Sequence, residues 1–411
     1  MRLPAFALAF LLSVGGAPAA SSRVANLPTA AEIDVVMKQL SGITGFQIHK
    51  QLPFQMVTRD QVNQFLKEQI RTSVKPEEIR AEEITLKKFG FVPADFDMKK
   101  TTIDLLTEQA AAFYDFHRKK LFISDWATQN MRETALVHEL GHALADQNFS
   151  IQKFLGKDSD NSEESAAREA VVEGQASWLM IEYAAHTAGK TLADPDTASE
   201  YLKTDPDAGD DDSEYPVFSK APLYLKRTLM FPYDEGERFQ QAVFLRDGKN
   251  AFAEVFRKPP VSTGQVIHPD RYFKDVTYKD PELPKPVAHA KTLVEGNMGE
   301  LDHSILLTQF IGADEAEELG PKVKGSAYRI DEVKKGHATM LVYASDWDDE
   351  EAAAKFFADY RKVLETKWKK IDVAKREADR FSGRSEDGYF ALTRKGAQVV
   401  SEEGFAGPLA E

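Results

Sequence analysis

The sequence of 411 residues contains no cysteine, which excludes disulfide bonds, thiol catalysis and cysteine-ligated metal sites. It is also short of basic residues, since 52 Lys and Arg stand against 66 Asp and Glu for a formal net charge of −14. Nucleic-acid backbones and anionic membrane surfaces both attract concentrated Lys and Arg. We therefore predict a protein that binds neither nucleic acid nor acidic membranes.

Long apolar runs are absent after the first ~20 residues, and the run found there is too short for a membrane span, which needs ~20 apolar residues. Arg2, an apolar stretch from Phe6 to Val14 and the small residues Ala17-Pro18-Ala19 follow in the order of a secretory signal peptide. We expect cleavage directly before or after Ala20. The mature protein is then secreted or periplasmic and keeps no membrane span.

The overall composition, 42% hydrophobic and 29% charged, is that of a globular protein. The pattern of polar and apolar residues changes along the chain. After the signal peptide at 1–20, residues 21–100 form a polar segment with helical periodicity. Residues 101–290 combine two short strands with long helices, and 291–411 combine several strands with one amphipathic helix. We therefore predict an α+β fold: a mostly helical domain with a small edge-stranded sheet, followed by a C-terminal α/β accessory module.

Local patterns locate the elements of the central domain. Residues 112–124 read as strand, connection and strand, and helices follow over about 128–147 and about 162–188. A helical pattern over 221–257 is interrupted at Phe231-Pro232-Tyr233, and the acidic stretch 192–216 reads as a surface loop. Nearer the N-terminus, Thr58-Arg59-Asp60-Gln61 is typical of a capping box at the start of a helix.

The first central helix contains His138-Glu139-Leu140-Gly141-His142, a match to H-E-x-x-H, the zincin signature. His138 and His142 are four residues apart, so both imidazoles leave one helix face and can bind one Zn²⁺. Glu139 is rotated by about 100° from His138, which places its carboxylate beside the ion as a general base rather than as a ligand.

A catalytic zinc needs a third protein ligand. Our preferred candidate is Glu173 in the second helix, which follows His142 after an interval of 30 residues, 143–172. Glu169 lies one turn earlier on the same face, so it is an alternative ligand or a partner that orients the ligand.

These motifs together resemble the gluzincin metallopeptidases, which pair H-E-x-x-H with a glutamate on a following helix. Glu173-Gly174-Gln175-Ala176 is similar to the E-G-x-A around that ligand in aminopeptidase N-type enzymes, although the interval is longer than is usual there. The resemblance covers roughly residues 112–240, and the wider chain is similar to uncharacterised exported bacterial proteins with the same two motifs. It implies a zinc metallopeptidase, a hydrolase of peptide or protein substrates, with Glu139 as general base.

Two residues are candidates for stabilising the oxyanion. Tyr233, in Phe231-Pro232-Tyr233-Asp234-Glu235-Gly236, resembles the tyrosine of the Y-x-x-G segment in aminopeptidase N-type enzymes, and His268 resembles the downstream histidine of thermolysin-like enzymes. An alternative function is a non-catalytic zincin-fold protein that binds a peptide or partner, but such a protein has no need for an intact Glu139. An enzyme that cleaves cell-wall peptide or another amide is a third hypothesis.

Overall fold

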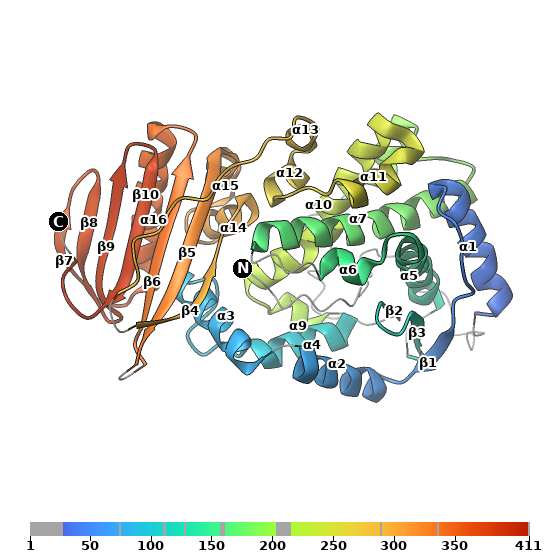
Figure 1. The fold of residues 1–411 in the computed structure, drawn as a ribbon, viewed down its shortest axis with the longest axis horizontal. Helices are drawn as coiled ribbons and strands as arrows, with labels where there is room; N and C mark the ends of the chain where they lie inside the picture. The colour runs from blue at the N-terminus through green and yellow to red at the C-terminus, as the bar shows by residue number, and fades with distance from the viewer. Residues whose placement is uncertain are drawn as a thin grey trace.

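The computed structural model describes residues 28–73, 75–109, 112–126, 129–156, 161–202, 215–287, 290–334 and 337–409. The predicted signal peptide lies outside these ranges, and so do residues 203–214 of the acidic stretch. None of the helices in the described ranges has the length and apolar character needed to cross a membrane. The fold is α+β, as predicted, with a helical part and a large C-terminal sheet side by side (Figure 1).

The helical part contains the short strands β1 (Phe54–Val57), β2 (Ala112–Asp115) and β3 (Lys120–Ser124). Its helices are α1 (Ala30–Thr44), α2 (Arg59–Ser73), α3 (Pro76–Phe89), α4 (Met98–Gln109), α5 (Gln129–Phe149), α6 (Ile151–Leu155), α7 (Ser162–Thr187), α8 (Pro195–Tyr201), α9 (Pro216–Ser219), α10 (Leu223–Asp247), α11 (Ala251–Arg257), α12 (Thr263–Ile267) and α13 (Pro269–Phe273). The predicted strand pair and the two predicted central helices are confirmed as β2, β3, α5 and α7.

Short-range hydrogen bonds explain where several helices begin. Thr29 and Glu32 form a capping box at the start of α1, which ends at Gly45 with a left-handed φ of 76°. The predicted box at α2 is confirmed: the Gln61 N–H donates to Thr58 Oγ1 at 3.2 Å, and the Thr58 N–H donates to Gln61 Oε1 at 2.9 Å.

The small sheet has the order β1-β3-β2, with β2 antiparallel and β1 parallel to β3. Strand β1 comes from the N-terminal segment and was not predicted. Helix α1 belongs to the same unit, because its Ile33, Met37 and Leu40 share one buried cluster with Leu140 of α5 and Val171 of α7. The N-terminal segment therefore supplies part of the core that supports α5 and α7.

Two predictions, one of a break and one of a loop, are wrong. Helix α10 continues through Phe231-Pro232-Tyr233, since burial of Pro232 in the core compensates for its missing N–H. Within the acidic stretch, Pro195–Tyr201 forms α8, with Asp194 as N-cap and Pro195 at the first helical position. Residues 258–286, which are rich in proline, contain α12 and α13.

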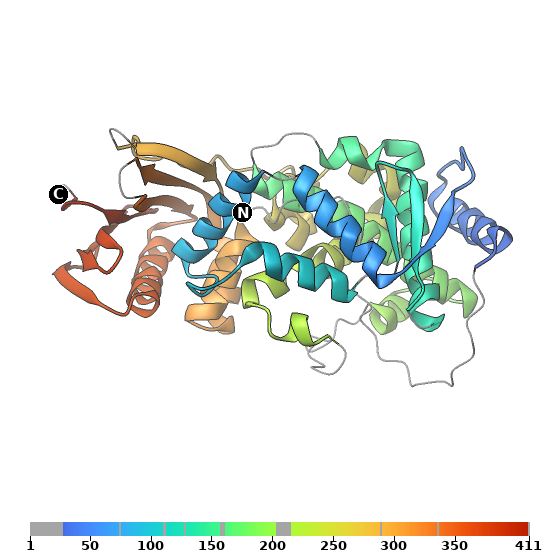
Figure 2. The ribbon, with the colours of Figure 1, turned by 90° about the horizontal axis from the view of Figure 1, so that it is seen from below.

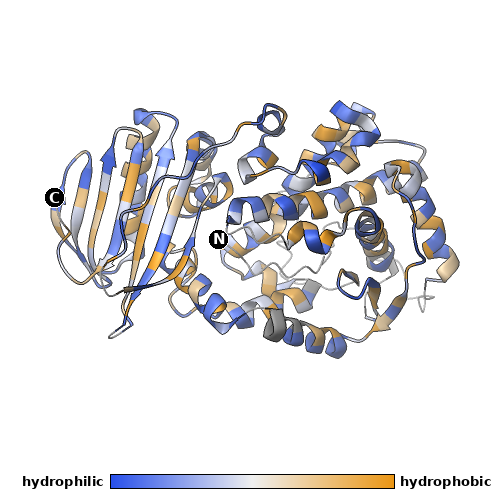
Figure 3. Cartoon of the chain, viewed as in Figure 1, coloured by the Kyte–Doolittle hydropathy of each residue, from blue (hydrophilic) through white to orange (hydrophobic). Residues whose placement is uncertain are grey.

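The C-terminal sheet is antiparallel with the order β4-β5-β6-β10-β9-β8-β7. Its strands contain both polar and apolar residues (Figure 3). The elements are β4 (Ala290–Gly296), α14 (Glu300–Phe310), α15 (Ala313–Leu319), β5 (Val323–Val333), β6 (Thr339–Trp347), α16 (Glu350–Lys367), β7 (Ile371–Arg376), β8 (Arg380–Ser385), β9 (Gly388–Lys395) and β10 (Gln398–Phe405). The last two strands, β9 and β10, follow one another as a hairpin.

Helix α3 connects the two parts of the molecule, and Figure 2 shows it beside the helices of the C-terminal sheet. Leu86 and Phe89 of α3 belong to the same buried cluster as Tyr343 and Phe356 of the sheet part. At the end of α3, the Lys367 Nζ donates to the Lys88 carbonyl at 2.7 Å. The N-terminal segment thus contributes to the cores on both sides.

Candidate metal centre

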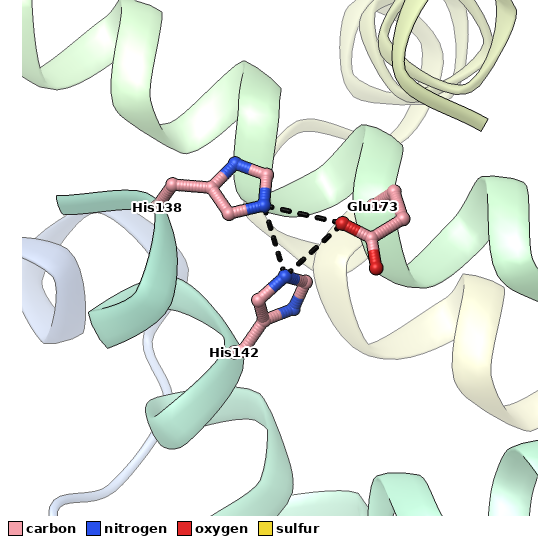
Figure 4. A group of neighbouring side chains, drawn as sticks. All are labelled: His138, His142 and Glu173. Carbon is pink, nitrogen blue, oxygen red and sulfur yellow. Dashed lines mark hydrogen bonds and ion pairs between the residues drawn. The ribbon is translucent and has the colours of Figure 1, made fainter. Parts of the chain in front are cut away.

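Three donor atoms converge where α5 faces α7. His138 Nε2 lies 2.9 Å from His142 Nε2, and Glu173 Oε2 lies 3.2 Å from each of these nitrogens (Figure 4). In a tetrahedral zinc site with bonds of ~2.0–2.1 Å, the donors are ~3.3 Å apart, so the group fits zinc. Among the described residues it is the one group of His, Asp and Glu donors close enough to hold a metal.

The protonation of these donors favours metal binding. Burial lowers the pKa of His138 to about 4, against the opposing effect of the hydrogen bond with Glu173. Burial alone would raise the pKa of Glu173, but the charge of His142 and the hydrogen bonds with both histidines lower it to about 2. A neutral imidazole and an ionised carboxylate are the forms that coordinate a metal.

Glu139 is fully buried beside the donor group, and only one of its oxygens is held by the protein. Oε2 accepts a hydrogen bond from the Tyr114 N–H at 2.7 Å, whereas Oε1 has no partner among the described residues. Burial and the negative charge of Glu173 raise the pKa of Glu139 well above its ordinary value. A buried oxygen without a partner is costly, so its presence here points to a water or ligand at this position.

Glycines allow the three helices around the site to approach closely. A Cβ on Gly174 would lie 2.0 Å from the carbonyl carbon of Gly236, so α7 and α10 touch backbone to backbone. On the other side of α7, Ala176 faces Gly141 of α5, where a Cβ added to Gly141 would lie 3.5 Å from Ala176 Cα, an ordinary contact distance. The Gly and Ala of the E-G-x-A pattern therefore set the two helix contacts that place Glu173.

Tyr233 of α10 lies beside the donor group, with its ring 6.0 Å from that of His138. Burial, the negative charges of Glu173 and Glu139, and a hydrogen bond with Glu173 raise the pKa of Tyr233 well above its ordinary value. Its hydroxyl is therefore a proton donor at every ordinary pH. Glu169 contributes to the same effect by its charge, but it is not in the donor group.

His268 occupies a different setting, between α12 and α13. Its Nε2 is 2.7 Å from Glu300 Oε1 at the start of α14, and Glu300 also accepts a hydrogen bond from Arg271 at 2.7 Å. The structure thus pairs His268 with the C-terminal part of the molecule, and its predicted catalytic role stays a prediction.

The contacts of the β2–β3 hairpin with this centre were not predicted from the sequence. The Tyr114 N–H holds Glu139, and the ring of Phe116 packs edge-on against His142 with centroids 5.9 Å apart. Backbone groups and packing rings leave no motif, so the one available signal was the position of the hairpin directly before the H-E-x-x-H helix.

Comparisons with known proteins agree with this geometry. Residues 94–199 match the family of the IrrE N-terminal-like domain, peptidase family M78, which is a family of zincin-like metallopeptidases. Searches of curated proteins and of solved structures each found no significant match. The matched residues include β2, β3, α5 and α7, and hence every member of the donor group. This part of the chain thus matches a zincin-like metallopeptidase domain, and His138, His142 and Glu173 are its candidate zinc site.

Proposed function

We propose that the protein is an exported zinc-dependent metallopeptidase, a hydrolase that cleaves peptide bonds in peptide or protein substrates. The observation that carries this proposal is the pairing of a His-His-Glu donor group with Glu139, whose buried Oε1 has no hydrogen-bond partner among the described residues. A protein that only binds peptides gains nothing from such a costly arrangement. The family match over residues 94–199 supports the same reaction class.

The chemistry divides between the ion and Glu139. Zinc bound by His138, His142 and Glu173 would polarise the scissile carbonyl and lower the pKa of a water towards ~7. Glu139 takes the proton of the attacking water on Oε1 and delivers it to the leaving amine.

Tyr233 is our candidate for stabilising the oxygen that becomes negative during attack. Its hydroxyl stays protonated and its ring lies beside His138, so it can direct a hydrogen bond towards the reacting carbonyl. His268 is the weaker candidate, because it pairs with Glu300 of the C-terminal part, whereas Tyr233 contacts both His138 and Glu173 of the donor group.

Export is proposed from residues 1–20 alone, whose charged, apolar and small-residue order is that of a signal peptide. N-terminal sequencing of the native protein tests this part separately. A chain that begins at Ala20 or Ser21 in a secreted or periplasmic fraction supports export, and a cytoplasmic chain that retains Met1 contradicts it.

The hydrolase proposal is tested by metal analysis together with a peptide-library digest of the wild type and of Glu139→Gln. We expect one zinc per chain in both proteins, and cleavage that the substitution lowers by ~10²–10⁴ because glutamine cannot accept the proton. Zinc-loaded wild type that cleaves no peptide would favour the alternative function, a zincin-fold module that binds peptides without hydrolysis.

A further inference from the structure

One carboxylate connects the β2–β3 hairpin to the helix that carries the histidine donors. Asp146 lies in α5 one turn after His142 and is 6% exposed. Its Oδ2 accepts hydrogen bonds from the Tyr114 hydroxyl at 2.8 Å and from Lys119 Nζ at 2.7 Å. Its Oδ1 accepts from Lys119 Nζ at 2.8 Å and from the Ile151 N–H at 2.9 Å. Asp146 is thus fully engaged, and three of its four bonds come from the hairpin.

Tyr114 contacts α5 at two points that lie almost two helical turns apart. Its backbone N–H donates to Glu139 Oε2 at 2.7 Å, and its side chain donates to Asp146. Because one residue makes both bonds, fixing the hydroxyl also fixes the position and direction of the N–H. The N–H in turn determines which way the Glu139 carboxylate faces, and a catalytic group displaced by ~1 Å can lose ~10²-fold in rate.

The same hairpin also supports a histidine donor. Phe116 is buried, packs edge-on against Tyr114 with centroids 5.4 Å apart, and lies 5.9 Å from the ring of His142. The turn that follows contains Lys119 at a φ of 53°, a left-handed conformation that is unfavourable for a residue other than glycine. The ion pair of Lys119 with Asp146 holds the side chain of this strained residue on α5.

We propose that Asp146 is a positioning residue of this centre: through Tyr114 and Lys119 it anchors the hairpin so that the Tyr114 N–H directs Glu139 and Phe116 supports His142. Asp146 acts through these residues and does not itself touch the donor group. The inference rests on the proposed function, since it takes Glu139 as the general base.

The test compares Asp146→Asn and Tyr114→Phe with a matched control, Asp115→Asn. Asp115 is as buried as Asp146, at 3% exposed, but its hydrogen bonds stay within the hairpin, from the N–H groups of His117 and Arg118. We measure kcat and KM, and amide hydrogen exchange of residues 112–116 in zinc-loaded and metal-free protein.

For both Asp146→Asn and Tyr114→Phe we expect kcat to fall by ~10–10² with little change in KM, and exchange at the Tyr114 N–H to accelerate by ~10-fold or more. The double variant should lose no more than the worse single variant, because both changes break one connection. Asp115→Asn should lower thermal stability and leave kcat and Tyr114 protection near wild type.

Equal losses of kcat and protection in Asp115→Asn would overturn the proposal, because hairpin stability alone would then explain them. Wild-type kcat and protection in Tyr114→Phe would overturn it as well. If Asp146→Asn does not fold, Tyr114→Phe, which removes one hydroxyl, carries the same test. If the wild type cleaves no peptide, the proposed function fails, and the exchange measurement still decides whether the anchor exists.

Discussion

Two glutamates, one in each part of the molecule, are both fully buried but differ in the number of groups that hydrogen-bond to their oxygens. Glu403 in β10 of the C-terminal sheet accepts hydrogen bonds on Oε1 from Tyr360 at 3.0 Å and from Ser401 at 2.9 Å. Its Oε2 accepts a hydrogen bond from Lys367 Nζ at 2.6 Å. Glu139 accepts one backbone N–H on Oε2, and in the part of the chain that the structure describes its Oε1 has no partner.

The difference separates a structural carboxylate from a functional one. Burying a charge is costly unless hydrogen bonds and an opposite charge compensate, and the network around Glu403 supplies both. At Glu139 a single hydrogen bond compensates for burial, and the carboxylate lies beside the three metal donors. Burial alone therefore identifies neither role, whereas the number of compensating partners distinguishes them.

The sharpest test of this comparison is to make the same change at both positions. Glu139→Gln should abolish most peptide hydrolysis, by ~10²–10⁴, and leave the thermal stability of the metal-free protein unchanged or higher, because it removes a poorly compensated buried acid. Glu403→Gln should do the reverse and cost about 3–5 kcal/mol of stability by leaving the Lys367 ammonium buried without its countercharge. Calorimetry and kcat measured on both variants check this, and a Glu139→Gln variant that unfolds easily would contradict it.

The next effect concerns the choice between Tyr233 and His268. Tyr233→Phe removes a hydroxyl but keeps the ring against His138, so kcat and kcat/KM should fall together by ~10²–10³ with zinc content unchanged. His268→Ala should act instead on stability, since it leaves Glu300 with Arg271 as its remaining cationic partner. Steady-state kinetics that are normal for Tyr233→Phe and impaired for His268→Ala would reverse our assignment.

The sequence predicted the donor residues of this centre, because each belongs to a short motif within one helix. His138 and His142 are recognisable because metal binding requires them four residues apart. Glu173 was identified by the resemblance of E-G-x-A to aminopeptidase N-type enzymes, and the structure shows that the small residues of this pattern lie at helix contacts. The hairpin contacts were not predictable, because the Tyr114 N–H has no residue signature. Strand β1 was missed for another reason: its partner β3 is far away in the sequence, so no neighbouring strand forms a hairpin pattern with it as β2 does with β3.

A smaller effect should follow from the glycine contact between α7 and α10. Gly174→Ala would place a Cβ 2.0 Å from the Gly236 backbone, which cannot move without shifting α10 and Tyr233. We expect a loss of about 1–3 kcal/mol or more in stability, together with weaker zinc binding. Gly141→Ala is the matched control, because its Cβ meets Ala176 and Leu179 at ordinary distances of 3.5 and 3.6 Å, so it should be neutral or stabilising. Equal losses in both variants would show that any bulk near the site is disruptive.

The smallest expected effect lies at the junction of the two parts, at the start of α7. Glu163 Oε2 accepts hydrogen bonds from the N–H and hydroxyl of Thr263 at 2.9 and 2.8 Å, and Gly299 lies against its carboxylate. Burial, and then the negative charge of Asp302, raise the pKa of Glu163 to about 7. The folded protein therefore holds a proton here that the unfolded chain releases near ~4.3, so this stabilising contribution is complete at acid pH and is lost as pH rises towards about 7. The glutamine of Glu163→Gln does not titrate. The unfolding free energy of this variant should therefore fall less between about pH 5 and 8 than the unfolding free energy of the wild type. Denaturant unfolding of both proteins across that range measures the slope, and parallel curves would mean that Glu163 does not couple the junction to pH.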